Sequence, residues 1–240
     1  MTVDGLARPD WLRPLTEALR DPTWRPPAIA VRPGVGARLA AVLILIGDGR
    51  TSVKGDDPLE PAESHPEILF VERPTTMRTH AAQIAFPGGA ADPHDVDLAA
   101  TALREATEET GLDPSGVDVL GQLPSAHVAV SGFDVTGVVG WWARPSPVGA
   151  VDPREVASVL AVPVARLVDP ANRAQVHHPS GYTGPAFQID GHLIWGLTAH
   201  LLDGVLDLAG WQQPWDLERL VDIPARYLTG RPDRGGPDAH

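Results

Sequence analysis

Residues 98–112, LAATALREATEETGL, carry a helical pattern with Arg104 and three glutamates inside six positions. Asp97 precedes the stretch and is a typical N-cap residue, while Gly111 is typical of the position that ends a helix. The other positions are mostly small or apolar, so we expect this helix to pack against the protein on several sides. The glutamates stand at i, i+3 and i+4 and therefore share one face: Glu105, Glu108 and Glu109.

This acidic face has two interpretations. A solvated acidic surface is the simpler one, because runs of charge usually face water. The apolar positions of the helix and the glycine-rich turn at 86–93, FPGGAADP, favour a half-buried cluster instead. Half-buried carboxylates need a counter-charge, which a hard divalent cation with oxygen ligands supplies.

The segments around this helix predict a single α/β domain. Aliphatic runs typical of buried strands stand at 38–47 and 67–73, and a strand running into a turn is expected at 84–89. Residues 48–66 are polar and predict a surface loop. The remaining expected elements are a helix at 9–20, short strands within 117–143, two short helices around a bend at Pro163 within 153–169, a hairpin around Asp190-Gly191 and a helix at 196–209.

Three regions follow from this pattern. We expect an N-terminal helix and proline-rich extension at 1–35, the α/β domain at 36–210, and a C-terminal extension with a frayed tail at 211–240.

Composition excludes several classes of function. Nineteen Lys and Arg against 31 Asp and Glu give a net charge of −12, which opposes binding to nucleic acid. The chain has no cysteine, which excludes disulfides, thiol nucleophiles and thiolate metal sites. The N-terminus does not resemble a signal peptide, and the longest apolar run, 39–46, is far shorter than the ~20 residues that span a bilayer. We therefore expect a cytoplasmic protein without a membrane partner.

The segment REATEETGL at 104–112 resembles the second half of the Nudix box, G-x5-E-x7-R-E-U-x-E-E-x-G-U, where U is aliphatic. The first half departs from this pattern. Ala90 stands where the first glycine belongs and Val96 where the first glutamate belongs, with Asp95 and Asp97 on either side. A loop one residue longer would let an aspartate replace that glutamate.

The resemblance extends beyond the box, over roughly residues 36–210. This whole region resembles the coenzyme A diphosphatase branch of the Nudix hydrolases. Before the box, that branch follows approximately L-L-T-x-R-S/A-x3-R-x-H-x-G-x-V/I-x-F-P-G-G. Positions that agree are Arg73, Arg78, His80, Ile84, Phe86, Pro87, Gly88 and Gly89. Positions that depart from it are Val71, Pro74 and Ala82, in place of the threonine, the small residue and the glycine.

The resemblance implies a Nudix-type α/β/α sandwich with a mixed sheet and a loop–helix–loop box. It implies Mg²⁺- or Mn²⁺-dependent hydrolysis of a nucleoside diphosphate derivative, with coenzyme A as the expected substrate. Glu105, Glu108 and Glu109 would hold the metal, and Arg104 would orient a ligating glutamate. Groups expected to contact substrate are Arg73, Arg78, His80, Gly88 and Gly89.

Glu155 is a further candidate, as a general base from outside the box. Its alternative is a carboxylate at the start of a helix, stabilised by the helix dipole. For Arg73 and Arg78 the alternative is pairing with surface acids, and for His80 a structural role in a loop.

Two other functions stay open. One is a Nudix hydrolase for ADP-ribose or another nucleotide, and the other is a non-catalytic Nudix module that senses a nucleotide. The intact REATEETGL argues against a sensor, which has no need of three metal carboxylates. The oligomeric state is also open, a homodimer included.

Overall fold

A computed structural model describes residues 6–21, 38–49, 65–75, 82–128, 131–178 and 181–228. Its centre is a mixed sheet in which β1 (Arg38–Gly47) and β7 (Phe133–Trp142) run parallel from Arg38↔Phe133 to Ile46↔Trp141. The other pairs in this sheet are antiparallel. Its other strands are β2 (Glu67–Glu72), β3 (Ile84–Ala85), β4 (Gly88–Ala90), β5 (Val117–Gln122), β6 (Ala126–Val128) and β8 (Ser158–Pro163).

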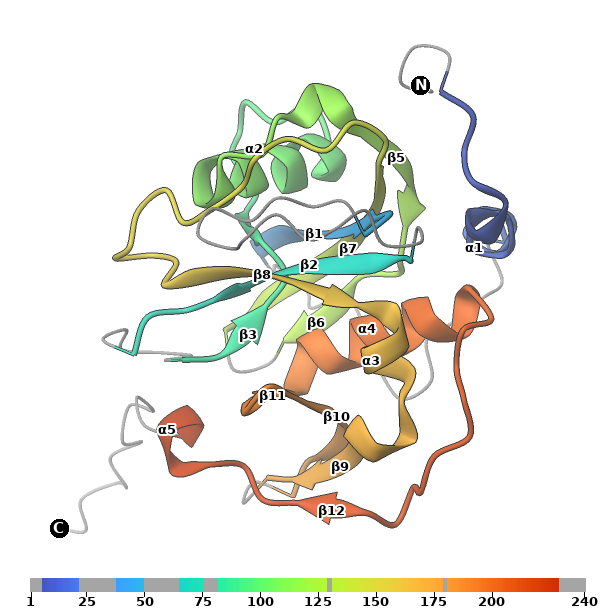
Figure 1. The fold of residues 1–240 in the computed structure, drawn as a ribbon. Coiled ribbons are helices and arrows are strands. Elements are labelled where there is room, and N and C mark those ends of the chain that lie inside the picture. Colours follow the sequence, from blue (N-terminus) through green and yellow to red (C-terminus); the bar gives the residue numbers. More distant parts are fainter. Residues whose placement is uncertain are drawn as a thin grey trace, which may run out of the picture.

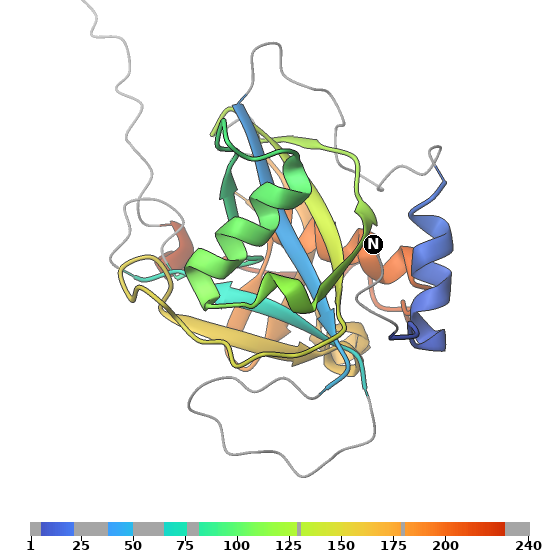
Figure 2. The ribbon, with the colours of Figure 1, turned by 90° about the horizontal axis from the view of Figure 1, so that it is seen from above.

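Helices cover both faces of the central sheet (Figures 1 and 2). On one face, α2 (Leu98–Thr110) packs Ala102 and Ala106 against Leu43 of β1 and its neighbours. On the other face, α4 (Gly196–Leu208) packs apolar side chains such as Leu202 against Ile44. The expected α/β/α sandwich is therefore confirmed.

A second, smaller sheet lies on the far side of α4, which is thus enclosed between two sheets (Figure 1). It contains β9 (Arg173–His177), β10 (Thr183–Ile189), β11 (His192–Ile194) and β12 (Leu220–Val221). The β10–β11 hairpin turns at Asp190 and Gly191, both with positive φ, as the sequence predicts. The described part of the C-terminal extension adds β12, parallel to β9, and α5 (Ala225–Leu228), while the predicted frayed tail lies outside the described residues.

The N-terminal helix is confirmed as a 3₁₀ turn, η1 (Asp10–Leu12), that continues into α1 (Arg13–Ala18). It buries Leu12 and Leu15 completely, and the Trp11 and Trp211 rings lie 5.9 Å apart. Shorter elements are η2 (Pro114–Gly116), α3 (Val164–Val168) and η3 (Pro170–Asn172). In the ranges that the structure describes, no helix combines the length and apolarity needed to cross a bilayer.

One predicted element is wrong. The first of the two helices expected within 153–169 is a turn followed by β8, and only the second, α3, is helical. Residues 158–162 are SVLAV, and they alternate between the two faces of the sheet while pairing with β2 from Ser158 to Pro163. Residues 158–163 form a strand because β2 offers them an edge to pair with, and a local helical pattern cannot reveal such a distant partner.

Candidate active site

The acidic helix α2 begins and ends as the sequence predicts. The Asp97 carboxylate accepts a hydrogen bond from the Ala100 N–H at 2.8 Å, and Gly111 ends the helix with φ 71°. These caps fix which residues face the sheet. Thr101 and Ala102 are fully buried, whereas 57% of the Glu108 side chain is exposed.

Arg104 is the centre of a network of hydrogen bonds beside the acidic face. Its Nη1 donates to Glu105 Oε1 at 2.9 Å and to Glu108 Oε2 at 3.1 Å, and its Nη2 donates to the Ala90 carbonyl at 3.0 Å. Asp95 accepts from Nε and Nη2, each at 3.0 Å, in a bidentate pair. This guanidinium holds the pKa of Asp95 well below its usual value.

Asp95 supplies the loop carboxylate that the box pattern places one residue later. Val96, at the pattern's position, has 91% of its surface exposed and points away from the network. Asp97 serves as the N-cap instead. Asp95 also accepts a hydrogen bond from the Thr101 hydroxyl at 2.8 Å, so the loop is tied to α2 at two points.

Gly88 and Gly89 of β4 hold two of the glutamates in place. The Gly88 N–H donates to Glu109 Oε2 at 3.0 Å. A Cβ on Gly88 would lie 2.4 Å from the Ala41 carbonyl oxygen, and a Cβ on Gly89 would lie 2.5 Å from the Glu105 carboxyl carbon. Only glycine permits this close approach between β4, β1 and the carboxylates.

Glu109 has a strongly raised pKa. Burial raises its pKa to about 7, although the Gly88 N–H and the charge of Arg73 favour its ionised form. The negative charges of Glu105 and Glu155 raise this pKa further, which shows that both lie within electrostatic range of Glu109. A buried acid surrounded by other carboxylates requires a positive charge to ionise at neutral pH.

The charges of Arg73 and Glu155, two predicted residues far from α2 in the sequence, both act on Glu109. Arg73 follows β2, and its Nε is buried without a hydrogen-bond partner among the described residues. Glu155 is exposed in the turn before β8, where its N–H donates to the Asp152 carbonyl at 2.9 Å. Arg78 and His80 lie outside the described residues.

A family model for the NUDIX domain matches residues 59–180. This chain belongs to the Nudix family. The Nudix hydrolase NudL of Photorhabdus laumondii, itself uncharacterised, is 39% identical over 145 residues, which cover 57% of this chain and 74% of that protein. The NudL of Cronobacter sakazakii is 39% identical over 153 residues, covering 60% and 77%. A solved Nudix hydrolase from M. smegmatis, RenU, is 25% identical with a TM-score of 0.42, covering 55% and 74%.

As a Nudix hydrolase, the protein acts on phosphoanhydride bonds of nucleoside diphosphate derivatives. Enzymes of this family generally need divalent cations. The donor set around α2 fits a hard cation, because it consists of carboxylate oxygens around a buried acid that lacks a full counter-charge. Within the described residues no three ligands are already gathered around one point, since Arg104 holds Glu105 and Glu108.

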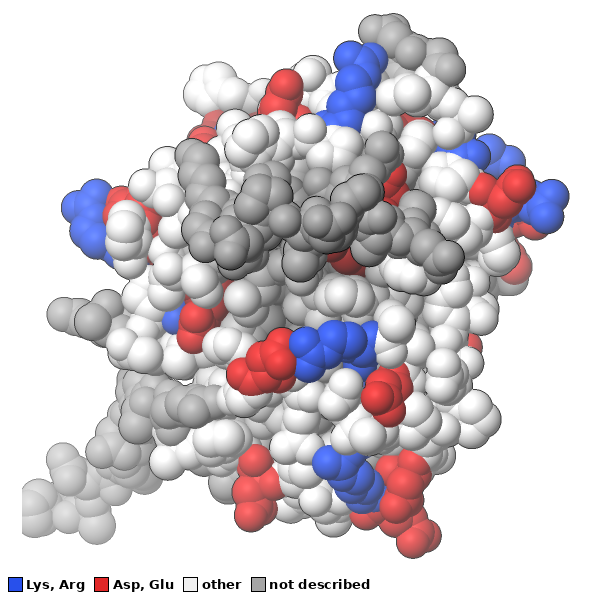
Figure 3. All heavy atoms as spheres, viewed as in Figure 1, with Lys and Arg blue, Asp and Glu red and all other residues white. Residues whose placement is uncertain are grey.

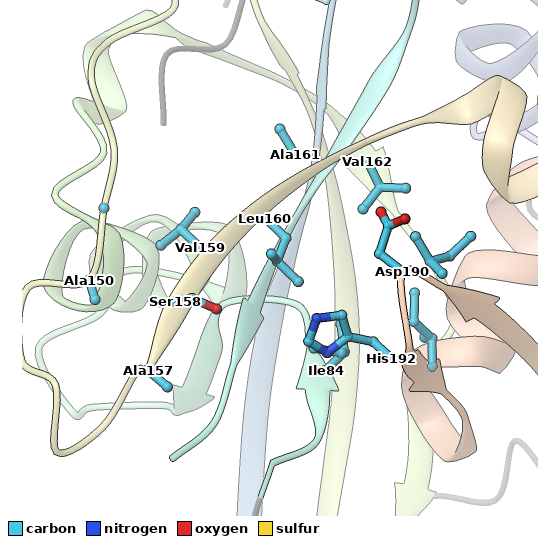
Figure 4. Close-up of a pocket in the computed structure, with 13 residues that line it drawn as sticks. Ile84, Ala150, Ala157, Ser158, Val159, Leu160, Ala161, Val162, Asp190 and His192 are labelled. Atoms are coloured by element: carbon cyan, nitrogen blue, oxygen red, sulfur yellow. The ribbon is translucent and has the colours of Figure 1, made fainter. Parts of the chain in front are cut away.

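A pocket lies beside the C-terminal end of α2, and the sequence does not predict it. Its volume is about 550 Å³, and it runs along β8 between the end of α2 and the β10–β11 hairpin (Figure 4). Glu72 lies beside it, accepting a hydrogen bond from Ser158 at 2.8 Å, with His192 Nδ1 3.9 Å from its other oxygen. These residues come from three separate strands, so no local pattern links them.

Proposed function

We propose that this Nudix hydrolase cleaves coenzyme A to 3′,5′-ADP and 4′-phosphopantetheine. The catalytic part is supported by the hydrogen bond from Gly88 to Glu109, by the close approach of Gly89 to Glu105 and by the effect of the Arg73 charge on the pKa of Glu109. The sequence resemblance to coenzyme A diphosphatases across 36–210 supports the choice of substrate.

Glu105, Glu108 and Glu109 would hold Mg²⁺ or Mn²⁺. When bound, the cation would neutralise diphosphate oxygens and lower the pKa of a water molecule. Arg104 positions two of these ligands, because its guanidinium is itself fixed by Asp95 and contacts Glu105 and Glu108.

Arg73 is proposed to contact the diphosphate. Its guanidinium lies close enough to Glu109 to lower the pKa of that acid, and its buried Nε is without a partner among the described residues. A planar guanidinium suits phosphate oxygens, which accept hydrogen bonds from its fork of N–H groups. Arg78 and His80, a few residues further along the chain, are proposed to extend this contact to the 3′-phosphate.

Glu155 is proposed to accept a proton from the attacking water. The alternative, a carboxylate at the start of a helix, loses its basis because residues 153–155 form a turn before β8. The exposed position of Glu155 and its electrostatic effect on Glu109 support a place at the edge of the site.

The test is hydrolysis of a panel of diphosphates by the purified protein with Mg²⁺ or Mn²⁺, with products identified by mass. We expect the highest kcat/KM for coenzyme A, no turnover in EDTA, and 3′,5′-ADP as one product. A kcat/KM well above this for ADP-ribose or a dinucleotide would overturn the substrate and leave the family intact. Binding of nucleotides without any turnover would indicate a sensor.

A further inference from the structure

A pocket of about 550 Å³ lies along β8, and the proposed function does not use it. Figure 4 shows Leu160, Val162 and Ile84 around one part of it, with Asp190 and His192 approaching from the β10–β11 hairpin. Backbone and side chains of consecutive residues from Ala157 to Val162 line it. The pocket therefore follows the length of a strand.

One end of this pocket lies beside the C-terminal turn of α2. At one end, it is lined by Gly149 and Ala150, and the Gly149 N–H donates to the Thr110 carbonyl at the end of α2 at 3.0 Å. Two residues later, the Val151 N–H donates to the Glu109 carbonyl at 3.2 Å. The pocket therefore begins beside the helix that carries the acidic face.

The pocket also faces an open edge of β8. In the described part of the chain, β8 pairs only with β2. The Val164 N–H continues that ladder by donating to the Pro66 carbonyl at 2.8 Å. Because paired residues alternate along an antiparallel ladder, Val159 and Ala161 direct their N–H and C=O groups away from β2, toward the pocket. Unpaired strand edges readily accept another extended chain.

The described lining residues do not favour a phosphate group. The lining residues that the structure describes include no Lys or Arg, and their acid, Asp190, pairs with Arg166 Nη1 at 2.6 Å. Around this face acidic and basic side chains are interspersed instead of forming a basic patch (Figure 3). A neutral chain with amide groups matches both the apolar lining and the open strand edge.

We infer that this pocket binds the pantetheine arm of the substrate as an added strand on β8. The arm is neutral beyond its phosphate and carries two amides, which pair with the outward N–H and C=O groups of Val159 and Ala161. This inference rests on the proposed function, because it assigns a place to one half of coenzyme A.

The test replaces one outward N–H. Ala161→Pro removes this donor on an edge where proline is tolerated, and Ala161→Val is the matched control that adds bulk and keeps the donor. The readout is inhibition of coenzyme A hydrolysis by its two halves, 4′-phosphopantetheine and 3′,5′-ADP. In Ala161→Pro, we expect the inhibition constant of 4′-phosphopantetheine to rise about five- to tenfold, the value of one hydrogen bond. That of 3′,5′-ADP should not change.

A second variant covers the case in which Ala161→Pro fails to fold, as judged by circular dichroism. Leu160→Trp narrows the pocket from the α4 face and should weaken 4′-phosphopantetheine selectively. An equal change for both halves, a change for 3′,5′-ADP alone, or no change would overturn the inference while coenzyme A is still hydrolysed. Absence of coenzyme A hydrolysis by the wild-type protein would instead overturn the proposed function, and this inference with it.

Discussion

The acidic face of α2 and the pocket along β8 differ in the origin and in the charge of their side chains. Arg104, Glu105 and Glu108 come from a single helix and form an ionic network with Asp95, and Glu109 lies on the same helix. The pocket draws on β3, β8 and the β10–β11 hairpin, and its lining is mostly apolar. The difference suggests a division of work, in which α2 provides the chemistry and the pocket distinguishes one substrate from another.

The largest effect that separates the two regions should come from Glu109. Glu109→Gln keeps the shape and the hydrogen bond from Gly88 but removes the charge, so turnover should fall by about two orders of magnitude or more. Glu108→Gln should also reduce turnover by orders of magnitude. Glu218→Gln, an exposed acid outside both regions, is the matched control. Steady-state kinetics with wild-type activity in both box variants would refute the role given to α2.

A smaller effect is expected from Asp95, which acts through Arg104. Asp95→Asn weakens the bidentate pair, so Arg104 would position Glu105 and Glu108 less well, and kcat should fall about ten- to a hundredfold. Asp97→Asn is the control, because asparagine is an equally good N-cap. If Asp95→Asn changes only thermal stability and not kcat or metal affinity, Asp95 has a purely structural role.

The features of α2 that local sequence predicts are its two caps and its acidic face. The caps and the shared face of α2 depend on spacing within the short stretch from Asp97 to Gly111, so the local pattern predicted them correctly. The replacement of the missing glutamate by Asp95 was only a possibility, because loop geometry decides which of two neighbouring aspartates reaches Arg104. The predicted helix before Pro163 was wrong because β2, ninety residues earlier, pairs with β8.

The remaining features depend on contacts between distant segments. Arg73 and Glu155 were predicted by family resemblance, and their approach to Glu109 results from the sheet. The pocket and the pairing of β12 with β9 gave no sequence signal, because each combines short segments that are unremarkable separately.

In the metal-free protein, the stability against unfolding should depend on pH through Glu109 of α2. The pKa of Glu109 is about 7 in the folded state against an ordinary 4.5, so between these values the folded protein keeps a proton that the unfolded chain releases. Stability in EDTA should therefore fall as pH rises from about 5 to about 7. Urea unfolding at both pH values measures this fall, and it should be smaller in Glu109→Gln. An identical slope in that variant would contradict the assignment.

His200, a residue of α4, should contribute a pH dependence of stability that is opposite in sign to that of Glu109 and smaller. Burial lowers its pKa from 6.5, and its Nε2 lies 2.7 Å from the Tyr182 hydroxyl. The unfolded chain binds the proton first, so this contribution is present above pH 6.5 and is lost as pH falls toward the lowered pKa. The difference between the melting temperatures at pH 5.5 and pH 7.5 should be smaller in His200→Gln than in the wild type. It should be unchanged in His94→Gln, an exposed control. Equal pH dependence in both variants would show that His200 is not responsible.

The most direct test of the central claim is titration of Mn²⁺ into the metal-free protein by calorimetry at pH 7.5, beside Glu109→Gln and Glu218→Gln. If the α2 carboxylates form the cation site, wild type and Glu218→Gln bind Mn²⁺ with the same affinity, and Glu109→Gln binds at least tenfold more weakly. Equal affinity in all three proteins would place the cation elsewhere and contradict the account.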